Sequence, residues 1–126
     1  MPEFAISGDV RLAFERLGNE AGDPVVFVHG LGDTRRLWID VLGLLPDGFR
    51  SLIYDLRGHG ESGSPMSAER YDMGLFIEDL AAILDAVRIP TASIVGFSLG
   101  GAVALHFALR YPERVRSVVA INANAA

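Results

Sequence analysis

Apolar and polar positions along the chain fall into two patterns, and each pattern predicts a different kind of element. Short, continuous apolar runs are typical of strands that are buried on both faces. Four such runs occur, at residues 24–28, 50–55, 91–96 and 115–121. Nearer the amino end, residues 4–6 and 10–17 alternate more loosely on either side of Ser7-Gly8-Asp9, which predicts a β-hairpin.

The stretches between these runs carry apolar residues at helical spacing and predict three helices. We place them from about residue 34 to 45, from 72 to 87 and from 99 to 110. The first has its apolar side chains along one side, and Pro46-Asp47-Gly48 ends it. The last is apolar almost all round, so we expect it to be deeply buried.

Strands and helices that alternate after an opening hairpin require crossover connections, which build a mainly parallel sheet. We therefore predict an α/β fold with helices on both faces of the sheet, formed as a single domain over residues 1–126. Ligands bind such sheets at the carboxyl ends of the strands. Three glycine-rich loops are predicted to meet at that rim: residues 29–32, 55–63 and 96–101.

The sequence Gly96-Phe97-Ser98-Leu99-Gly100 stands where a predicted strand turns directly into a predicted helix. A G-x-S-x-G turn of this kind is a nucleophile elbow, which holds a serine hydroxyl above the sheet in a strained backbone conformation. Ser98 is then a candidate nucleophile, and the Leu99 amide a candidate oxyanion donor. The alternative is an ordinary serine that caps the following helix.

The acidic composition and the absence of cysteine argue against several classes of partner and cofactor. The net charge is −5 with no basic cluster, which argues against nucleic acid and anionic membranes as partners. Without cysteine there are no disulfides and no thiolate metal sites, and we predict neither a cofactor nor a metal. No signal-peptide pattern and no apolar run of ~20 residues occurs, so we expect a cytoplasmic protein.

Four motifs appear in one order along the whole chain: VVFVHGLGDTRRLW (25–38), YDLRGHGES (54–62), VGFSLGG (95–101) and YPERV (111–115). With them the chain resembles the α/β-hydrolase superfamily, in the branch of esterases, lactonases and C–C-bond hydrolases that includes the enol-lactone hydrolases. The resemblance implies that Ser98 is the nucleophile and that the Leu31 and Leu99 amides form the oxyanion hole. It also implies that His29 and Gly30 shape the first loop, that Gly96 and Gly100 allow the elbow, and that residues 57–60 form a structural loop beside the site.

The resemblance covers only the N-terminal half of such a hydrolase. The family order is Ser, then Asp or Glu, then His, with the last two on loops after later strands. The chain would therefore be a truncated core that lacks the last strands, the lid and the C-terminal helices. His106 lies about 12 Å along its helix from Ser98 at ~1.5 Å per residue, so it cannot reach the hydroxyl.

Two other histidines precede the serine. His59 is expected to be structural, and so are the acids near the rim: Asp33, Asp55 and Glu61. His29 ends a strand predicted to lie beside the elbow, so it is retained as a possible base, although the resemblance gives it a role in loop geometry.

Two hypotheses of function follow. The first is acyl transfer on a small ester or lactone at Ser98, impaired because the acid and histidine of the family are absent. The second is an inactive folding or assembly module that forms a homo-oligomer, either through an exposed edge strand at 115–121 or by swapping elements. Phosphate or dinucleotide binding is disfavoured, because the elbow lacks the G-x-G-x-x-G spacing and the P-loop lysine.

Overall fold

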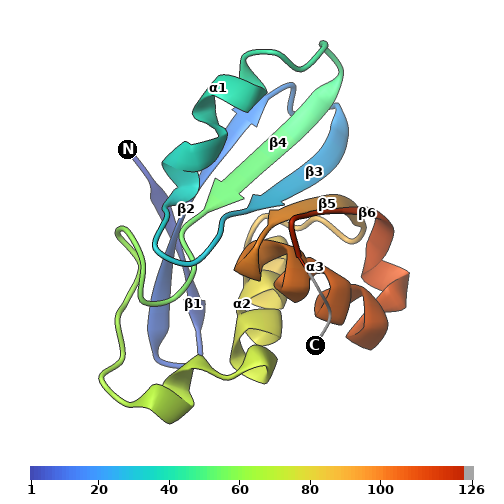
Figure 1. Cartoon of the computed structure of the whole chain (residues 1–126). Helices are drawn as coiled ribbons and strands as arrows, with labels where there is room; N and C mark the ends of the chain where they lie inside the picture. Colours follow the sequence, from blue (N-terminus) through green and yellow to red (C-terminus); the bar gives the residue numbers. More distant parts are fainter. Residues whose placement is uncertain (124–126) are drawn as a thin grey trace.

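A computed structural model describes residues 1–123 and contains one six-stranded sheet (Figure 1). The strands are β1 (Glu3–Ser7), β2 (Val10–Gly18), β3 (Asp23–Val28), β4 (Phe49–Tyr54), β5 (Ala92–Phe97) and β6 (Val115–Ile121). They lie in the order β1-β2-β4-β3-β5-β6. The first two strands are antiparallel to their neighbours, and the other four run parallel to one another. This confirms the predicted fold class.

Helices cover both faces of the sheet. They are the 3₁₀ turns η1 (Arg35–Trp38), η2 (Ala68–Tyr71) and η3 (Pro112–Arg114), and the α-helices α1 (Ile39–Leu42), α2 (Met73–Ala86) and α3 (Leu99–Arg110). In Figure 1, α1 lies on one side of the sheet and α2 with α3 on the other. None of the helices in residues 1–123 has the length and apolar character needed to cross a bilayer.

The side-chain alternation of β3 divides the core into two parts. Val26 and Val28 point toward α2 and α3 and join the larger cluster of buried apolar residues. Val25 and Phe27 point the other way and pack with Trp38 in a smaller cluster under η1. A strand that buries both faces must be apolar at successive positions, which is why this run is continuous in the sequence.

The predicted hairpin is confirmed at the amino end. Ser7 pairs with Val10 across a two-residue turn, and Gly8 has a φ of +61°. Glycine adopts this left-handed conformation without steric cost.

The prediction for residues 34–45 is wrong in the length of the helix and in the single apolar side. The segment is a 3₁₀ turn followed by a single α-helical turn that ends at Leu42, before Pro46 is reached. A 3₁₀ segment has three residues per turn, so the apolar residues do not line up on one stripe. Among them Trp38 is buried, whereas Leu44 is 86% exposed.

The expectation that the last helix is deeply buried is also wrong for one of its faces. Val103, Ala104 and Phe107 of α3 are fully buried against the sheet. Leu109, on the opposite face, is 76% exposed. The sheet packs against only one face of this helix, so the apolar residues on its other face stay exposed.

The strand β6 lies at the edge of the sheet, as expected, and pairs with β5 alone among the described strands. Val119 and Ile121 share the face of the sheet opposite α3 and are 51% and 40% exposed. An apolar edge of this kind offers unpaired backbone groups to another strand.

Candidate active site

Ser98 occupies the tip of the turn between β5 and α3 and has a strained backbone. Its φ is +56° and its ψ −119°, a combination that costs a non-glycine residue on the order of 1–3 kcal/mol. Three backbone hydrogen bonds hold it there: the Ser98 N–H donates to the Ile121 carbonyl at 2.9 Å, and the Ser98 carbonyl accepts from the Gly101 N–H at 2.9 Å and from the Ala102 N–H at 3.2 Å. The elbow is therefore fixed from β6 on one side and from α3 on the other.

Glycine at positions 96 and 100 lets three backbone segments approach one another. A Cβ on Gly96 would overlap the Gly100 carbonyl, and one on Gly100 would overlap the carbonyls of Val28 and His29. The first turn of α3 therefore touches the end of β3 directly. This contact places Ser98 beside the loop that follows β3.

The hydroxyl of Ser98 does not cap α3. The side chain accepts no hydrogen bond from the first turn of the helix, so the alternative of an ordinary capping serine is wrong. Ser98 is half-buried at the carboxyl ends of β3 and β5.

The loop between β3 and η1, residues 29–34, runs past the elbow. A Cβ built on Gly30 would lie 3.1 Å from the Ser98 Cβ and 3.2 Å from the Phe97 carbonyl oxygen. Leu31 follows immediately, with an exposed side chain. Leu99 is the first residue of α3, so its N–H has no acceptor within the helix. The structure thus brings Gly30 and the two peptides predicted as oxyanion donors to the same rim as Ser98.

His29 is fully buried and uses both ring nitrogens within the protein. Its Nε2 accepts from the Leu56 N–H at 3.0 Å, so the ring proton is on Nδ1 and is donated to the Gly30 carbonyl at 2.7 Å. Burial lowers the pKa of His29, and the neighbouring His59 ring lowers it further. A neutral imidazole has one lone pair, which here is already occupied. The sequence-based possibility that His29 is the base for Ser98 is therefore wrong.

His59, on the loop of residues 55–63, binds the 29–34 loop. Its Nε2 accepts from the Gly32 N–H at 3.0 Å, and its Nδ1 lies 3.0 Å from the Arg57 carbonyl oxygen, to which it donates. The His29 and His59 rings are 5.0 Å apart in an edge-to-face arrangement. His106 is half-buried near the middle of α3, two helical turns from Ser98.

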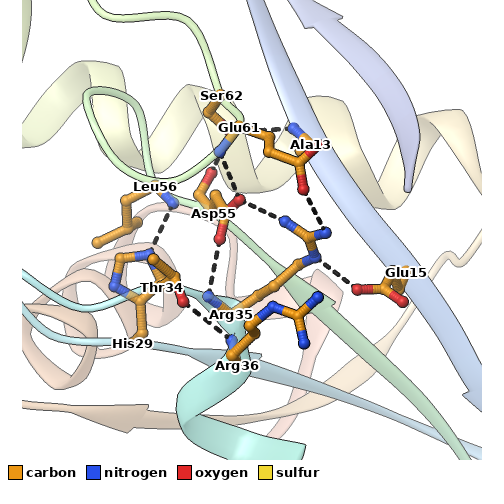
Figure 2. A network of polar contacts seen from close by, with 10 residues as sticks. All are labelled: Ala13, Glu15, His29, Thr34, Arg35, Arg36, Asp55, Leu56, Glu61 and Ser62. Carbon is orange, nitrogen blue, oxygen red and sulfur yellow. Dashed lines mark hydrogen bonds and ion pairs between the residues drawn. The ribbon is translucent and has the colours of Figure 1, made fainter. Parts of the chain in front are cut away.

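Arg35 and Asp55 form the centre of a buried charge network (Figure 2). The Arg35 guanidinium donates to Glu15 at 2.6 Å, to Asp55 at 2.6 Å and to Glu61 at 2.8 Å. Burial alone would lower the pKa of Arg35, but its hydrogen bonds to Glu61 and Glu15 and the Asp55 charge outweigh burial and raise it. Arg35 therefore stays cationic and balances the fully buried Asp55 carboxylate.

The Asp55 carboxylate also accepts from two backbone N–H groups, one at the start of η1 and one in the 55–63 loop. Asp55 accepts from the Arg35 N–H at 2.7 Å and from the Glu61 N–H at 2.9 Å. The sequence analysis anticipated loop hydrogen bonding for Asp55 and Glu61 but missed Arg35. The available signal was a basic residue directly after a glycine-rich loop, and its acidic partners lie on other segments.

A second buried ion pair anchors the 55–63 loop to α2. Arg57 donates to Asp79 through Nε at 2.7 Å and Nη2 at 2.8 Å, and both residues are almost inaccessible to solvent. The hydrogen bonds to Asp79 raise the pKa of Arg57. This pairing supports the sequence-based expectation that residues 57–60 are structural.

Comparison with known proteins identifies the family. A family model described as the alpha/beta hydrolase fold matches residues 23–126. The chain belongs to the α/β-hydrolase family. Its parallel strands, its elbow and its two flanking loops are thus the amino-terminal elements of an α/β-hydrolase sheet.

Individual α/β-hydrolases are similar over nearly the whole chain. The 3-oxoadipate enol-lactonase 2 of Acinetobacter baylyi is 32% identical over 117 residues, which are 93% of this chain and 43% of that protein. The bifunctional epoxide hydrolase 2 of Mus musculus is 35% identical over 114 residues, 90% of this chain and 20% of that protein. The crystal structure of a hydrolase from Pseudomonas aeruginosa PA01 superposes with a TM-score of 0.93 at 34% identity, covering 98% of this chain and 46% of that one. The chain spans less than half the length of each.

Proposed function

We propose that the chain provides the nucleophile and the oxyanion hole of a serine hydrolase that transfers the acyl group of a small ester or lactone. The observation that carries this proposal is the backbone of Ser98, held at positive φ between β5 and α3 beside Gly30. Strain of this kind persists where the surrounding structure fixes it, and it is frequent at active sites. The relatives hydrolyse different bonds according to their names, so family membership alone does not choose the reaction. A serine hydroxyl at the elbow favours acyl transfer.

In the proposed step, the Ser98 oxygen attacks the carbonyl carbon, and the carbonyl π bond opens to an oxyanion. The Leu31 and Leu99 N–H groups donate to that oxyanion. The proton of Ser98 passes to solvent, because His29 and His59 use their Nε2 lone pairs within the loops and His106 lies two turns along α3. The carbonyl then re-forms as the C–O bond of the substrate breaks, and the leaving alkoxide, which in a lactone stays attached to the acyl group, takes a proton from solvent. The acyl-serine that remains is hydrolysed by water. No cofactor is needed.

A serine without a histidine partner reacts slowly. In subtilisin, loss of the catalytic histidine lowers kcat by roughly 10⁶, and about 10³–10⁴ over water survives through binding and the oxyanion hole. We therefore expect the turnover of this chain to be impaired relative to a complete triad. Phosphonylation by a reactive probe is the more sensitive measure of Ser98.

Ser98→Ala is expected to abolish labelling by a fluorophosphonate and to remove residual turnover of p-nitrophenyl acetate. In the labelling reaction the Ser98 oxygen bonds to phosphorus, fluoride leaves and the hydroxyl proton passes to solvent. Ser117→Ala is the matched control, since Ser117 is exposed on β6 and its hydroxyl contacts that of Ser93. Equal labelling of all three proteins would remove Ser98 from the chemistry.

A second candidate function is self-association through β6. The apolar positions Val119 and Ile121 at the sheet edge favour it. We expect the wild-type chain to sediment above the monomer mass at high concentration and Val119→Lys to sediment as a monomer. Leu109→Lys is the control, because Leu109 is exposed on α3 rather than on the edge strand. A wild-type chain that remains monomeric would contradict this candidate.

A further inference from the structure

The 29–34 loop is held mainly by the 55–63 loop. His29 accepts from the Leu56 N–H at one end, the Gly32 N–H donates to His59 in the middle, and the Arg35 N–H donates to Asp55 where η1 begins. Each bond joins a side chain of one loop to the backbone of the other. The conformation of the residues that flank Ser98 is therefore set by the segment after β4.

The bond from Gly32 to His59 acts at the centre of a turn. The Asp33 N–H donates to the Gly30 carbonyl at 3.1 Å, so residues 30–33 form a hydrogen-bonded β-turn. Gly32 has a φ of +83°, which is typical of the third position of a type II turn. In types I and II the peptide between the two central residues points in opposite directions. Because His59 accepts the N–H of this central peptide, between Leu31 and Gly32, it selects one of the two directions.

We propose that His59 is a positioning residue for the oxyanion hole: by accepting from the Gly32 N–H, it holds the 30–33 turn, which carries Leu31, in one conformation beside Ser98. The proposal rests on the proposed function of Ser98. Its physical basis is separate: without the acceptor, the peptide between Leu31 and Gly32 can rotate, and the turn loses the bond that fixes its centre to the 55–63 loop. His59 touches neither Ser98 nor the oxyanion in this proposal.

The ring of His59 is itself fixed in the required tautomer. Its Nδ1–H donates to the Arg57 carbonyl, which leaves Nε2 as the acceptor, and Arg57 is anchored to Asp79.

Two variants of His59 distinguish the effect of its hydrogen-bond acceptor from the effect of its aromatic ring. His59→Phe keeps an aromatic ring against His29 and removes the acceptor, whereas His59→Gln offers an amide oxygen near the position of Nε2. We expect His59→Phe to lower the amide-exchange protection of Gly32 roughly tenfold, the equivalent of one hydrogen bond. We expect its fluorophosphonate labelling rate to fall at least about tenfold, and by no more than the 10²–10³ that loss of a whole oxyanion donor costs. His59→Gln should restore both.

Gly32 protection in the wild-type chain gives a third measurement, which does not require His59→Phe to fold. The Gly32 amide should be protected from exchange in the wild type and in His59→Gln. Unchanged Gly32 protection in His59→Phe, or a labelling rate equal in all three proteins despite lost protection, would overturn the positioning role. A wild-type chain that labels no faster than Ser98→Ala would overturn the proposed function instead, while Gly32 protection would still report the hydrogen bond.

Discussion

Gly100→Ala is expected to leave the chain largely unfolded, with a loss of more than about 4 kcal/mol of unfolding free energy. The added Cβ would overlap the carbonyls of Val28 and His29, which belong to the backbone at the carboxyl end of β3, an interior strand of the sheet. Backbone atoms cannot rotate away as a flexible side chain can, so β3 and α3 would have to separate. Urea unfolding, monitored by circular dichroism, measures the loss of unfolding free energy.

Gly43→Ala is the matched control for this substitution. Gly43 ends α1 with a helical φ of −66°, and the nearest atom to an added Cβ is the Asp40 carbonyl oxygen at 3.5 Å. Alanine there restricts the unfolded chain without strain and should stabilise by about 0.4–1 kcal/mol. If Gly100→Ala unfolded at the same urea concentration as Gly43→Ala, the close contact between α3 and β3 would not exist in solution.

Arg57→Met is expected to destabilise the chain by about 3–5 kcal/mol, because it leaves the Asp79 carboxylate buried without its partner. Arg57 and Asp79 are 2% and 0% exposed and share two hydrogen bonds, so neither charge can turn toward water. The double variant Arg57→Met with Asp79→Leu removes both charges and should recover most of the loss. Thermal and urea unfolding of the two single variants and the double variant measure the coupling free energy between Arg57 and Asp79.

An exposed ion pair provides the comparison for the double-mutant cycle on Arg57 and Asp79. Arg16 and Glu3 pair on the hairpin with side chains that are 36% and 46% exposed. Arg16→Gln should therefore cost less than about 1 kcal/mol. Equal losses for Arg57→Met and Arg16→Gln would mean that solvent reaches the Arg57 site.

The sequence predicted the strands of this sheet well because each strand is long enough to show its own pattern. The run at residues 24–28 is apolar at successive positions since β3 buries both faces, and the glycines at 96 and 100 are imposed by contacts of the elbow. Both are properties of short segments, which a sequence displays directly.

The features that the sequence did not predict depend on contacts between distant segments. The exposure of Leu109 depends on what lies against the outer face of α3, and the broken helix after Arg35 depends on where Trp38 meets β3 and β4. Likewise, Arg35 is bound by Glu15 on β2 and by Asp55 and Glu61 after β4. No local pattern in residues 33–38 indicates those partners.

The hydrogen bond from Ser98 to Ile121 couples the turn between β5 and α3 to the outermost strand. Ile121 is the last residue of β6, and amide exchange is fastest where strand ends fray. Each time the end of β6 detaches, Ser98 loses one of the three backbone hydrogen bonds that keep it at positive φ. A strand paired with the outer side of β6 would suppress that fraying and would thereby also preserve the strained backbone of Ser98.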